Sequence, residues 1–247
     1  VGGCVRDMLR GEKPKDWDVT TNAKPEEITK VFPDSFYENK FLTVTVKTES
    51  DDPTLREIEV TSFRAEGKYT DKRHPDDIRF AKTLGEDLSR RDFTVNAMAL
   101  ASRIANNELG ITEKKSHVHS LFLIPNSEYE LIDPFDGQSD LKKKIIRAVG
   151  DPKERFDEDA LREMRAVRFA TELGFTIEKE TRGAIQNLSG NLAFIAKERI
   201  RDEFMKIIGA ANAREGIELL EETGLLAHII PELREGIGVT NRPKIFT

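Results

Sequence analysis

The sequence predicts an α+β fold in two parts, a mixed-sheet domain over residues 1–147 followed by a helical part over residues 148–247. Short β-branched runs alternate with helical stretches over the first 100 residues, whereas helical periodicity dominates from about Asp151 to the end. A chain of 247 residues is long enough for two compact domains of ordinary size or one large one.

The first part is predicted to contain short elements with recognisable ends. Glycine residues precede the first helix, and Pro25 with two following acids favours the start of the second. In chain order we expect a helix at 5–9, a strand at 17–20, a helix at 25–31, paired strands at 42–47 and 58–63, a charged loop at 64–75, a strand or helix at 93–100 and an irregular insertion at 103–129.

The second part is predicted to be helical throughout, because its apolar residues recur with helical spacing. Gly174 and Gly224 lie where helices are expected to stop. The expected helices cover residues 156–173, 178–188, 197–209 and 214–223.

The composition excludes several classes of protein. Hydrophobic residues make up 38% and charged residues 34%, which is typical of a globular protein with a charged surface, and no apolar run reaches the length of a membrane span. The single cysteine, Cys4, cannot form an intrachain disulfide and fits a reducing cytoplasm. A net charge of −6 argues against a protein coated in basic charge but allows a local basic groove. The start at Val1, directly before glycines that a strand is expected to precede, indicates a fragment.

An Asp-x-Asp pair, Asp16 and Asp18, is the strongest chemical feature. In an extended strand residues i and i+2 point to the same face, so both carboxylates are expected to project together. A divalent cation such as Mg²⁺ relieves the repulsion between them. The alternative is an acidic pair on a solvated turn.

Glu59 is the candidate for a third carboxylate. It alternates with Ile58 and Val60, so it is expected to face the opposite side of its strand, and Glu57 shares that face. A carboxylate beside two metal-binding aspartates could orient an attacking hydroxyl. An exposed strand acid with no such role is the alternative.

Two further segments carry residues suited to phosphate binding. Gly2 and Gly3 precede a short helix, where backbone N–H groups could approach a phosphate and Arg6 could bind a phosphate oxygen or the ribose. Arg91 has the fork of donors that suits phosphate or ribose, and Asp92 could cap the next element or fix an arginine. A plain turn and a capped helix start with solvated arginines are the alternatives.

A charged stripe is expected on the helix 156–173. Glu158, Arg162 and Arg165 cluster opposite the apolar face, with Asp159 beside them, while Arg168 falls toward the apolar face. A carboxylate and a guanidinium could together read the amine and the ring nitrogen that C and A share, and so accept CTP and ATP alike. A ladder of salt bridges along the helix is the alternative.

Four segments occur in the order typical of one family: Gly-Gly-Cys-Val-Arg-Asp, Asp-Trp-Asp-Val-Thr, Arg-Arg-Asp-Phe-Thr-Val-Asn-Ala-Met-Ala and Glu-Asp-Ala-Leu-Arg. Over residues 1 to about 210 the chain resembles the class II tRNA nucleotidyltransferases, the CCA-adding enzymes of the polymerase β-like superfamily. The resemblance implies a nucleotidyltransferase head followed by a helical neck and partial body.

The resemblance also implies a reaction and its residues. CMP and AMP would be added from CTP and ATP to the 3′ end of tRNA, with Mg²⁺ as cofactor. The catalytic carboxylates would be Asp16, Asp18 and Glu59, of which Asp16 and Asp18 would bind the metal. Nucleotide contacts would come from Gly3, Arg6, Arg91, Asp159, Arg162, Arg165 and Arg168. The segment 67–75 resembles the family's flexible loop, which helps to switch specificity from C to A.

Other readings remain open. A bacterial poly(A) polymerase shares the head, although this chain has the CCA-adding form at Glu-Asp-Ala-Leu-Arg and Asn-Ala-Met-Ala, and a split CC-adding or A-adding enzyme is also compatible. A non-catalytic RNA-binding module with an inactive head is the alternative of another class. His117 and His119 in the insertion are read as solvated rather than metal-binding.

Overall fold

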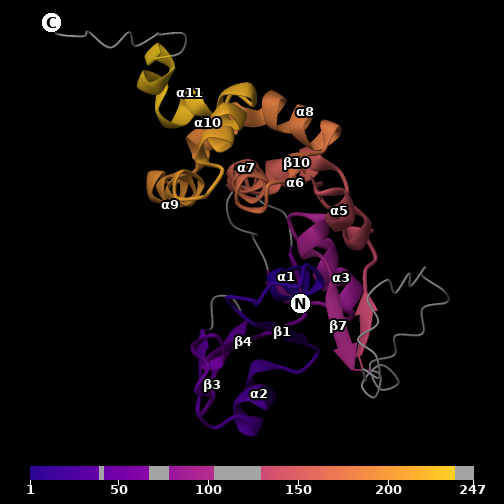
Figure 1. Cartoon of the computed structure of the whole chain (residues 1–247). Coiled ribbons are helices and arrows are strands. Elements are labelled where there is room, and N and C mark those ends of the chain that lie inside the picture. Colours follow the sequence, from indigo (N-terminus) through magenta and orange to yellow (C-terminus); the bar gives the residue numbers. More distant parts are fainter. Residues whose placement is uncertain (39–41, 67–77, 103–128, 237–247) are drawn as a thin grey trace, which may run out of the picture.

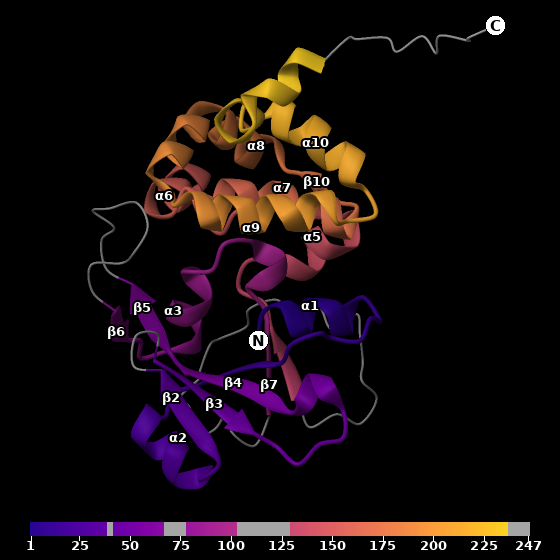
Figure 2. The same cartoon turned by 90° about the vertical axis from the view of Figure 1, so that its left-hand side faces the viewer.

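The computed structural model describes residues 1–38, 42–66, 78–102 and 129–236, and shows a sheet-containing part stacked against a helical part (Figures 1 and 2). The α+β class with a mixed sheet is confirmed. Residues 67–77, most of the predicted loop, and 103–128, with His117 and His119, lie outside the described residues. None of the described helices is both long and apolar enough to cross a membrane.

The sheet-containing part begins with a short helix and ends in a two-stranded ribbon. Its elements are α1 (Gly3–Leu9), β1 (Asp18–Thr21), α2 (Pro25–Val31), β2 (Ser35–Glu38), β3 (Thr43–Lys47), η1 (Pro53–Leu55), β4 (Glu57–Ser62), β5 (Arg64–Glu66), β6 (Ile78–Phe80), α3 (Leu84–Ser89), η2 (Thr94–Asn96), β7 (Ala99–Ser102) and β8 (Tyr129–Ile132).

The helical part follows and is drawn in pink-red through orange to yellow in Figure 1. Its elements are α5 (Gly137–Lys143), β9 (Ile145–Ile146), α6 (Pro152–Glu158), α7 (Leu161–Leu173), β10 (Thr176–Ile177), α8 (Lys179–Leu188), η3 (Ser189–Phe194), α9 (Lys197–Ile208), α10 (Ala213–Glu222), α11 (Leu226–Ile229) and η4 (Pro231–Gly236).

The main sheet has the strand order β1-β4-β3-β2. β1 runs parallel to β4, and the β4–β3 and β3–β2 pairs are antiparallel, which confirms the predicted pairing of β3 with β4. Val60 of β4 pairs with Val44 of β3, and both pack against Ile28 of α2 in one buried cluster. Because α2 covers this face, polar side chains that alternate with the valines are left on the opposite face.

Three expectations for the first part are wrong in detail. Residues 64–66 were expected to be loop but form β5, which pairs with β6. The residues at 93–100, expected to be one strand or helix, form the 3₁₀ turn η2 and then the start of β7. Tyr129 was expected in the insertion but is the first residue of β8. This strand forms an antiparallel pair with β7, a pairing that the local sequence does not indicate.

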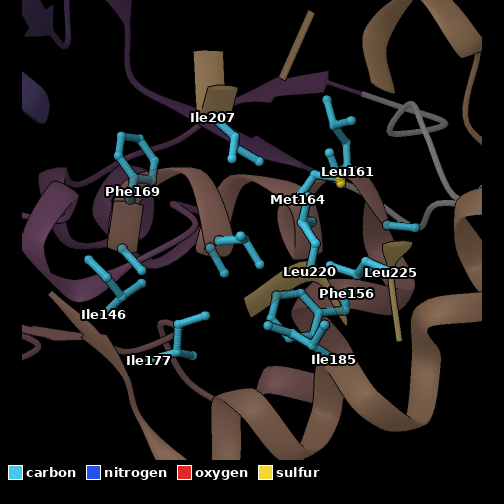
Figure 3. Close-up of a cluster of buried hydrophobic side chains, with 14 of the residues drawn as sticks. Ile146, Phe156, Leu161, Met164, Phe169, Ile177, Ile185, Ile207, Leu220 and Leu225 are labelled. Carbon is cyan, nitrogen blue, oxygen red and sulfur yellow. The ribbon is translucent and has the colours of Figure 1, made fainter. Parts of the chain in front are cut away.

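The largest hydrophobic cluster lies in the helical part and reaches into the first part (Figure 3). Its fully buried side chains include Phe156, Met164 and Ile207, and Phe93 joins them from the segment before η2. The two parts therefore share a core. A shared core fixes their relative position more firmly than a solvated linker would.

The predicted helix 156–173 is wrong, because the chain forms two helices there. Asp159 has an extended backbone, with φ −140° and ψ 103°, and separates α6 from α7. Its side chain accepts a hydrogen bond of 3.1 Å from the backbone N–H of Leu161. Aspartate favours such caps over helix interiors, so the break has a local cause. The apolar face expected on α7 is confirmed, since Leu161, Met164 and Val167 are buried.

The remaining helix boundaries agree well with the sequence. α2 has the predicted bounds, α8 and α9 differ from the predicted ranges by one residue at one end, and α10 begins and ends one residue earlier than predicted. Gly174 ends α7 with φ +65°, in the left-handed region that favours glycine.

Two helical glycines predict opposite effects of alanine. A Cβ on Gly216 of α10 would lie 2.7 Å from Ile207 Cγ2 and 2.7 Å from Thr171 Oγ1, whereas a Cβ on Gly183 of α8 would meet nothing within 4 Å. We expect Gly216→Ala to lower the free energy of unfolding by about 1–3 kcal/mol through overpacking. Gly183→Ala is the matched control, and should raise it by about 0.5–1 kcal/mol because alanine favours helices. Urea unfolding followed by circular dichroism measures both free energies. Equal effects of the two variants would contradict the close packing of α10 against Ile207 and Thr171 at Gly216.

Candidate functional site

A polar pocket of about 820 Å³ lies where the two parts meet. Figures 1 and 2 show α1 facing the helical part from below. One wall comes from α1, the segment after it and β1, and the other from α7 and α9. Of the residues predicted for the site, the pocket is lined by Gly3, Arg6, Asp16, Asp18, Arg91, Arg165 and Arg168.

The Asp-x-Asp pair is brought together, although not by one strand. β1 begins at Asp18, and Asp16 lies exposed in a bend before it, so the expectation that a strand places both is wrong. Both carboxylates nevertheless line the pocket. Burial raises the pKa of Asp18, the guanidinium of Arg91 lowers it, and the like charge of Asp16 raises it further. A cation bound beside the two carboxylates would offset both the burial of Asp18 and its repulsion from Asp16.

Glu59 lies beside Asp18 in the sheet. In the β1–β4 ladder Asp18 pairs with Glu59, and in the β3–β4 ladder Glu59 pairs with Thr45, so the three residues share one face. The predicted alternation is confirmed, since Glu57 and Glu59 are exposed and Val60 is buried. Glu59 is not among the residues that line the pocket.

The start of α1 depends on glycine for a steric reason. The helix begins at Gly3, two residues earlier than predicted, and Gly2 before it has φ +79°. A Cβ on Gly2 would lie 2.6 Å from Arg91 Nη1. Gly2 therefore lets Arg91 lie against the beginning of α1. Gly2 and Arg91 belong to two different sequence motifs, and neither motif indicated that the two residues are in contact.

Asp92 connects the arginines of the two walls. Arg165 of α7 donates from Nε (2.8 Å) and from Nη2 (2.6 Å) to Asp92 Oδ2. Asn96 donates to Asp92 Oδ1 (3.2 Å) and accepts from Arg6 Nη1 (2.7 Å). Burial raises the pKa of Asp92, but Arg165 and these hydrogen bonds outweigh it, so the pKa is held below its ordinary value. Of the two roles considered for Asp92, it fixes an arginine.

Arg91 is held by a second buried carboxylate. Its Nη2 lies 3.5 Å from Asp87, whose side chain is fully buried and also binds Arg90 at 2.8 Å. Burial lowers the pKa of Arg91, and Asp87 opposes that effect. The guanidinium thus remains paired although it is shielded from water. Asp87 was not predicted as part of the site, although it lies only four residues before Arg91 in the chain.

Asp159 and Arg162 do not line the pocket. Asp159 binds Arg199 of α9 at 3.1 Å. Arg162 donates to Glu158 (2.8 Å) and to the backbone carbonyl of Arg90 (3.2 Å). The alternative considered for this stripe was a ladder of salt bridges, and one such i,i+4 pair is present between Glu158 and Arg162.

Arg168 faces the pocket rather than the core, although helical spacing placed it toward the apolar face. Its Nε lies 2.7 Å from Glu203 of α9, and its Nη1 lies 3.5 Å from Glu172. Burial lowers its pKa, which Glu203 partly offsets. The carboxylate from α9 explains how an arginine is accommodated so close to the core.

Several lining residues were not predicted. Charged side chains from α1 and the segment after it, and from α7 and α9, add to the two walls, and their charge was the only sequence signal. They are Asp7, Arg10, Glu12, Lys13, Lys15, Glu172 and Lys206. Within the described residues no group of three or more His, Cys, Asp or Glu side chains is arranged to hold a metal ion. Any metal there would need ligands from substrate or water in addition to Asp16 and Asp18.

The chain was compared with known protein families and structures. Residues 1–147 match the model of the "Poly A polymerase head domain", and residues 174–237 match "Probable RNA and SrmB- binding site of polymerase A". A curated relative from Anoxybacillus flavithermus, named CCA-adding enzyme, is 42% identical over 237 residues, covering 94% of this chain and 51% of the relative. The chain thus spans about half the length of the curated relatives it matches.

The chain is also similar to solved structures of CCA-adding enzymes. The CCA-adding enzyme of Bacillus stearothermophilus in complex with CTP matches with a TM-score of 0.72 and 37% identity, covering 91% of this chain and 47% of that one. The CCA-adding enzyme of Thermotoga maritima complexed with tRNA matches with a TM-score of 0.68 and 25% identity, covering 98% of this chain and 49% of that one.

The buried pair of Asp92 and Arg165 makes a testable contribution to stability. Asp92→Asn leaves the Arg165 guanidinium without its anionic partner, and we expect it to lower the free energy of unfolding by about 2–3 kcal/mol at pH 7. Asp202→Asn is the matched control, because its pair with Arg201 is more than half exposed on both sides and should matter by less than about 0.5 kcal/mol.

The pH dependence of the stability lost in Asp92→Asn tests whether the loss is electrostatic. Since the folded pKa of Asp92 is depressed, its stabilisation is present above the ordinary carboxyl pKa and is lost as pH falls through the folded value. Urea unfolding of both variants between pH 7 and pH 3 tests this. A loss for Asp92→Asn no greater than for Asp202→Asn would contradict the role of the pair.

Proposed function

The chain belongs to the family of the poly A polymerase head domain, with relatives named CCA-adding enzyme, and from this premise we propose that it adds CMP and AMP from CTP and ATP to the 3′ end of tRNA. The observation that carries the proposal is the pocket between the two parts. It places the pair of carboxylates and the glycine-led helix α1 on one wall and arginines of α7 on the other. This arrangement suits a nucleoside triphosphate with its metal.

The residues of the pocket fit a divalent cation because Asp18 is shielded from water beside the like charge of Asp16. Members of this family depend on metal, and we propose Mg²⁺, whose ligands are a few carboxylates, water and phosphate oxygens. When bound by Asp16 and Asp18, the metal supplies positive charge for the phosphate oxygens and lowers the pKa of the attacking hydroxyl.

The reaction proposed is a displacement at phosphorus. The 3′-oxygen of the RNA forms a bond to the α-phosphorus of the nucleotide, and the bond from that phosphorus to the oxygen bridging to the β-phosphate breaks, releasing pyrophosphate. Glu59, next to Asp18 in the sheet, orients the attacking hydroxyl. Arg6, Arg91, Arg165 and Arg168 bind the phosphates and the ribose, together with the backbone of Gly3.

Base choice is assigned to Asp159 and Arg162. A carboxylate and a guanidinium together match the amine and the ring nitrogen of both C and A. Arg162 is bound to Glu158 and to the carbonyl of Arg90, and Asp159 to Arg199. Reading a base in the pocket therefore requires these two side chains to exchange their present partners for the nucleotide.

Two further assignments rest on the same proposal. We place the boundary of the nucleotidyltransferase head between residues 147 and 148, which the extent of the head-domain match supports. We place the reaction in the cytoplasm, where tRNA and nucleoside triphosphates meet and a free thiol such as Cys4 stays reduced.

A direct incorporation assay tests the function. The full-length protein is given tRNA transcripts that end before CCA, after C and after CC, with CTP, ATP or both, and with Mg²⁺ or EDTA. Completion of CCA followed by a stop is expected. Addition of C alone, or of one A to the CC end alone, would indicate a split-function enzyme, and a long A tail a poly(A) polymerase. No metal-dependent product would indicate a non-catalytic RNA-binding module.

Removing one carboxylate of the pair should separate chemistry from binding. Asp16→Ala is expected to lower the rate of CMP incorporation by at least about a thousandfold, since the metal loses a ligand, while CTP binding is partly retained through the arginines. Glu59→Gln should also reduce the rate, and Glu57→Gln, on the same face one pair further along the strand, is its matched control. Rapid-quench incorporation and calorimetric titration with CTP measure the two effects. Full activity of Asp16→Ala would refute the metal assignment.

Removing the base-reading pair should relax selectivity. The double variant Asp159→Ala with Arg162→Ala is expected to reduce discrimination against UTP and GTP by about tenfold or more, because each bidentate base contact contributes about 1–3 kcal/mol. The matched control is Arg201→Ala with Asp202→Ala, an exposed arginine–aspartate pair of α9 away from the pocket. Competition between nucleotides on a tRNA ending before CCA measures the ratio. Unchanged selectivity of the first double variant would refute the assignment.

A further inference from the structure

Three arginines of the pocket converge on one aromatic ring. The guanidinium carbons of Arg168, Arg165 and Arg6 lie 4.2, 5.3 and 5.5 Å from the centroid of Phe169. Arg165 and Arg168 belong to α7, as does Phe169 itself, whereas Arg6 belongs to α1. The ring therefore contacts guanidinium groups from both walls of the pocket.

The ring itself is fixed by the core. Phe169 belongs to the main hydrophobic cluster, where Figure 3 shows it at one end of the group. It packs against the fully buried Phe93 in an edge-to-face arrangement, with centroids 5.8 Å apart and planes at 79°. Phe93 directly follows the buried Asp92, which binds Arg165. One short segment thus fixes both the ring and one of its arginines.

The exposure of Phe169 decides what it can do. It lines the pocket, but it is only 7% exposed, which is too little for a nucleotide base to stack on its face. Direct contact with a base is therefore excluded, and the ring acts on the ligand through the arginines.

Three cations at this distance from one another repel. Each has a carboxylate partner, namely Asp7 for Arg6, Asp92 for Arg165 and Glu203 for Arg168. Burial lowers the pKa of Arg168, and the nearby charge of Arg165 lowers it further. An aromatic face attracts a guanidinium through its quadrupole, and the attraction grows where water is excluded. The ring thus offsets part of the cost of gathering the arginines.

We infer that Phe169 is a positioning residue, whose ring holds Arg6, Arg165 and Arg168 in a preorganised cluster for the phosphates of the incoming nucleotide. The inference rests on the proposed function, because it takes the ligand to be a nucleoside triphosphate. Arginines that are already in place lose less rotamer freedom on binding, so the nucleotide binds more tightly. The ring contributes to phosphate binding and leaves base choice to other residues.

The test compares binding of CTP and of cytidine by calorimetry in the full-length protein, with thermal unfolding of each variant alongside. Phe169→Leu should weaken CTP binding about tenfold and cytidine binding by less than about twofold, since only CTP carries phosphates. The matched control is Phe156→Leu, a residue of the same buried cluster that does not line the pocket, and its CTP binding should stay within about twofold of the unaltered protein.

A second replacement keeps the shape of the ring. Difluoro- and trifluorophenylalanine at position 169 preserve the packing but progressively remove the negative face, so CTP binding should weaken stepwise with the number of fluorines. Equal CTP affinity across this series, or equal losses for Phe169→Leu and Phe156→Leu, would overturn the inference. Failure of the unaltered protein to bind CTP would instead refute the proposed function, so the two failures are distinguishable.

Discussion

The buried carboxylate of Asp92 is the interaction on which the pocket depends. It accepts hydrogen bonds from Arg165 of the helical part, from Asn96 of the first part and from the backbone of Phe93. A buried carboxylate is costly unless its oxygens are satisfied, and here every partner is a donor. The requirement to satisfy Asp92 therefore fixes the two walls of the pocket relative to each other.

The same constraint organises the positive charge of the site. Arg91 is held by Asp87, Arg165 by Asp92 and Arg168 by Glu203. An arginine paired in this way is partly neutralised, but it is already in position when a phosphate arrives. A site built of freely rotating arginines would lose more side-chain entropy on binding the same ligand. The structure thus favours geometric precision over the greatest possible positive potential.

Hydrophobic packing holds the segment that carries Asp92 in place. Phe93 follows Asp92 directly and lies in the main cluster with Phe169, so the segment that carries the buried carboxylate is also anchored in the core. Glycine is required at the other side, since Gly2 has φ +79°, a conformation that residues with a side chain rarely adopt. The packing of Phe169 on Phe93 therefore connects the core to the arginines at this one point, which distinguishes this site from one carried on surface loops.

The sequence by itself determined those features whose causes are local. Pro25 with its following acids defined α2, alternation assigned Glu59 to the face opposite Val60, and Gly174 ended α7. Residue type and spacing, which are properties of short segments, also predicted seven residues that line the pocket: Gly3, Arg6, Asp16, Asp18, Arg91, Arg165 and Arg168. The sequence even contained a capping signal for α3, where Thr83 accepts from the backbone of Glu86, although no helix was predicted there.

Only the tertiary structure decided how these residues combine. Arg6 meets Asn96 across 90 positions of the chain, Arg165 meets Asp92 across 73, and Phe169 gathers arginines from α1 and α7. Likewise Arg162 donates to the backbone carbonyl of Arg90 and lies outside the pocket that its motif suggested. Local periodicity carries no information about such pairs, because they form only when the shared core brings the two parts together.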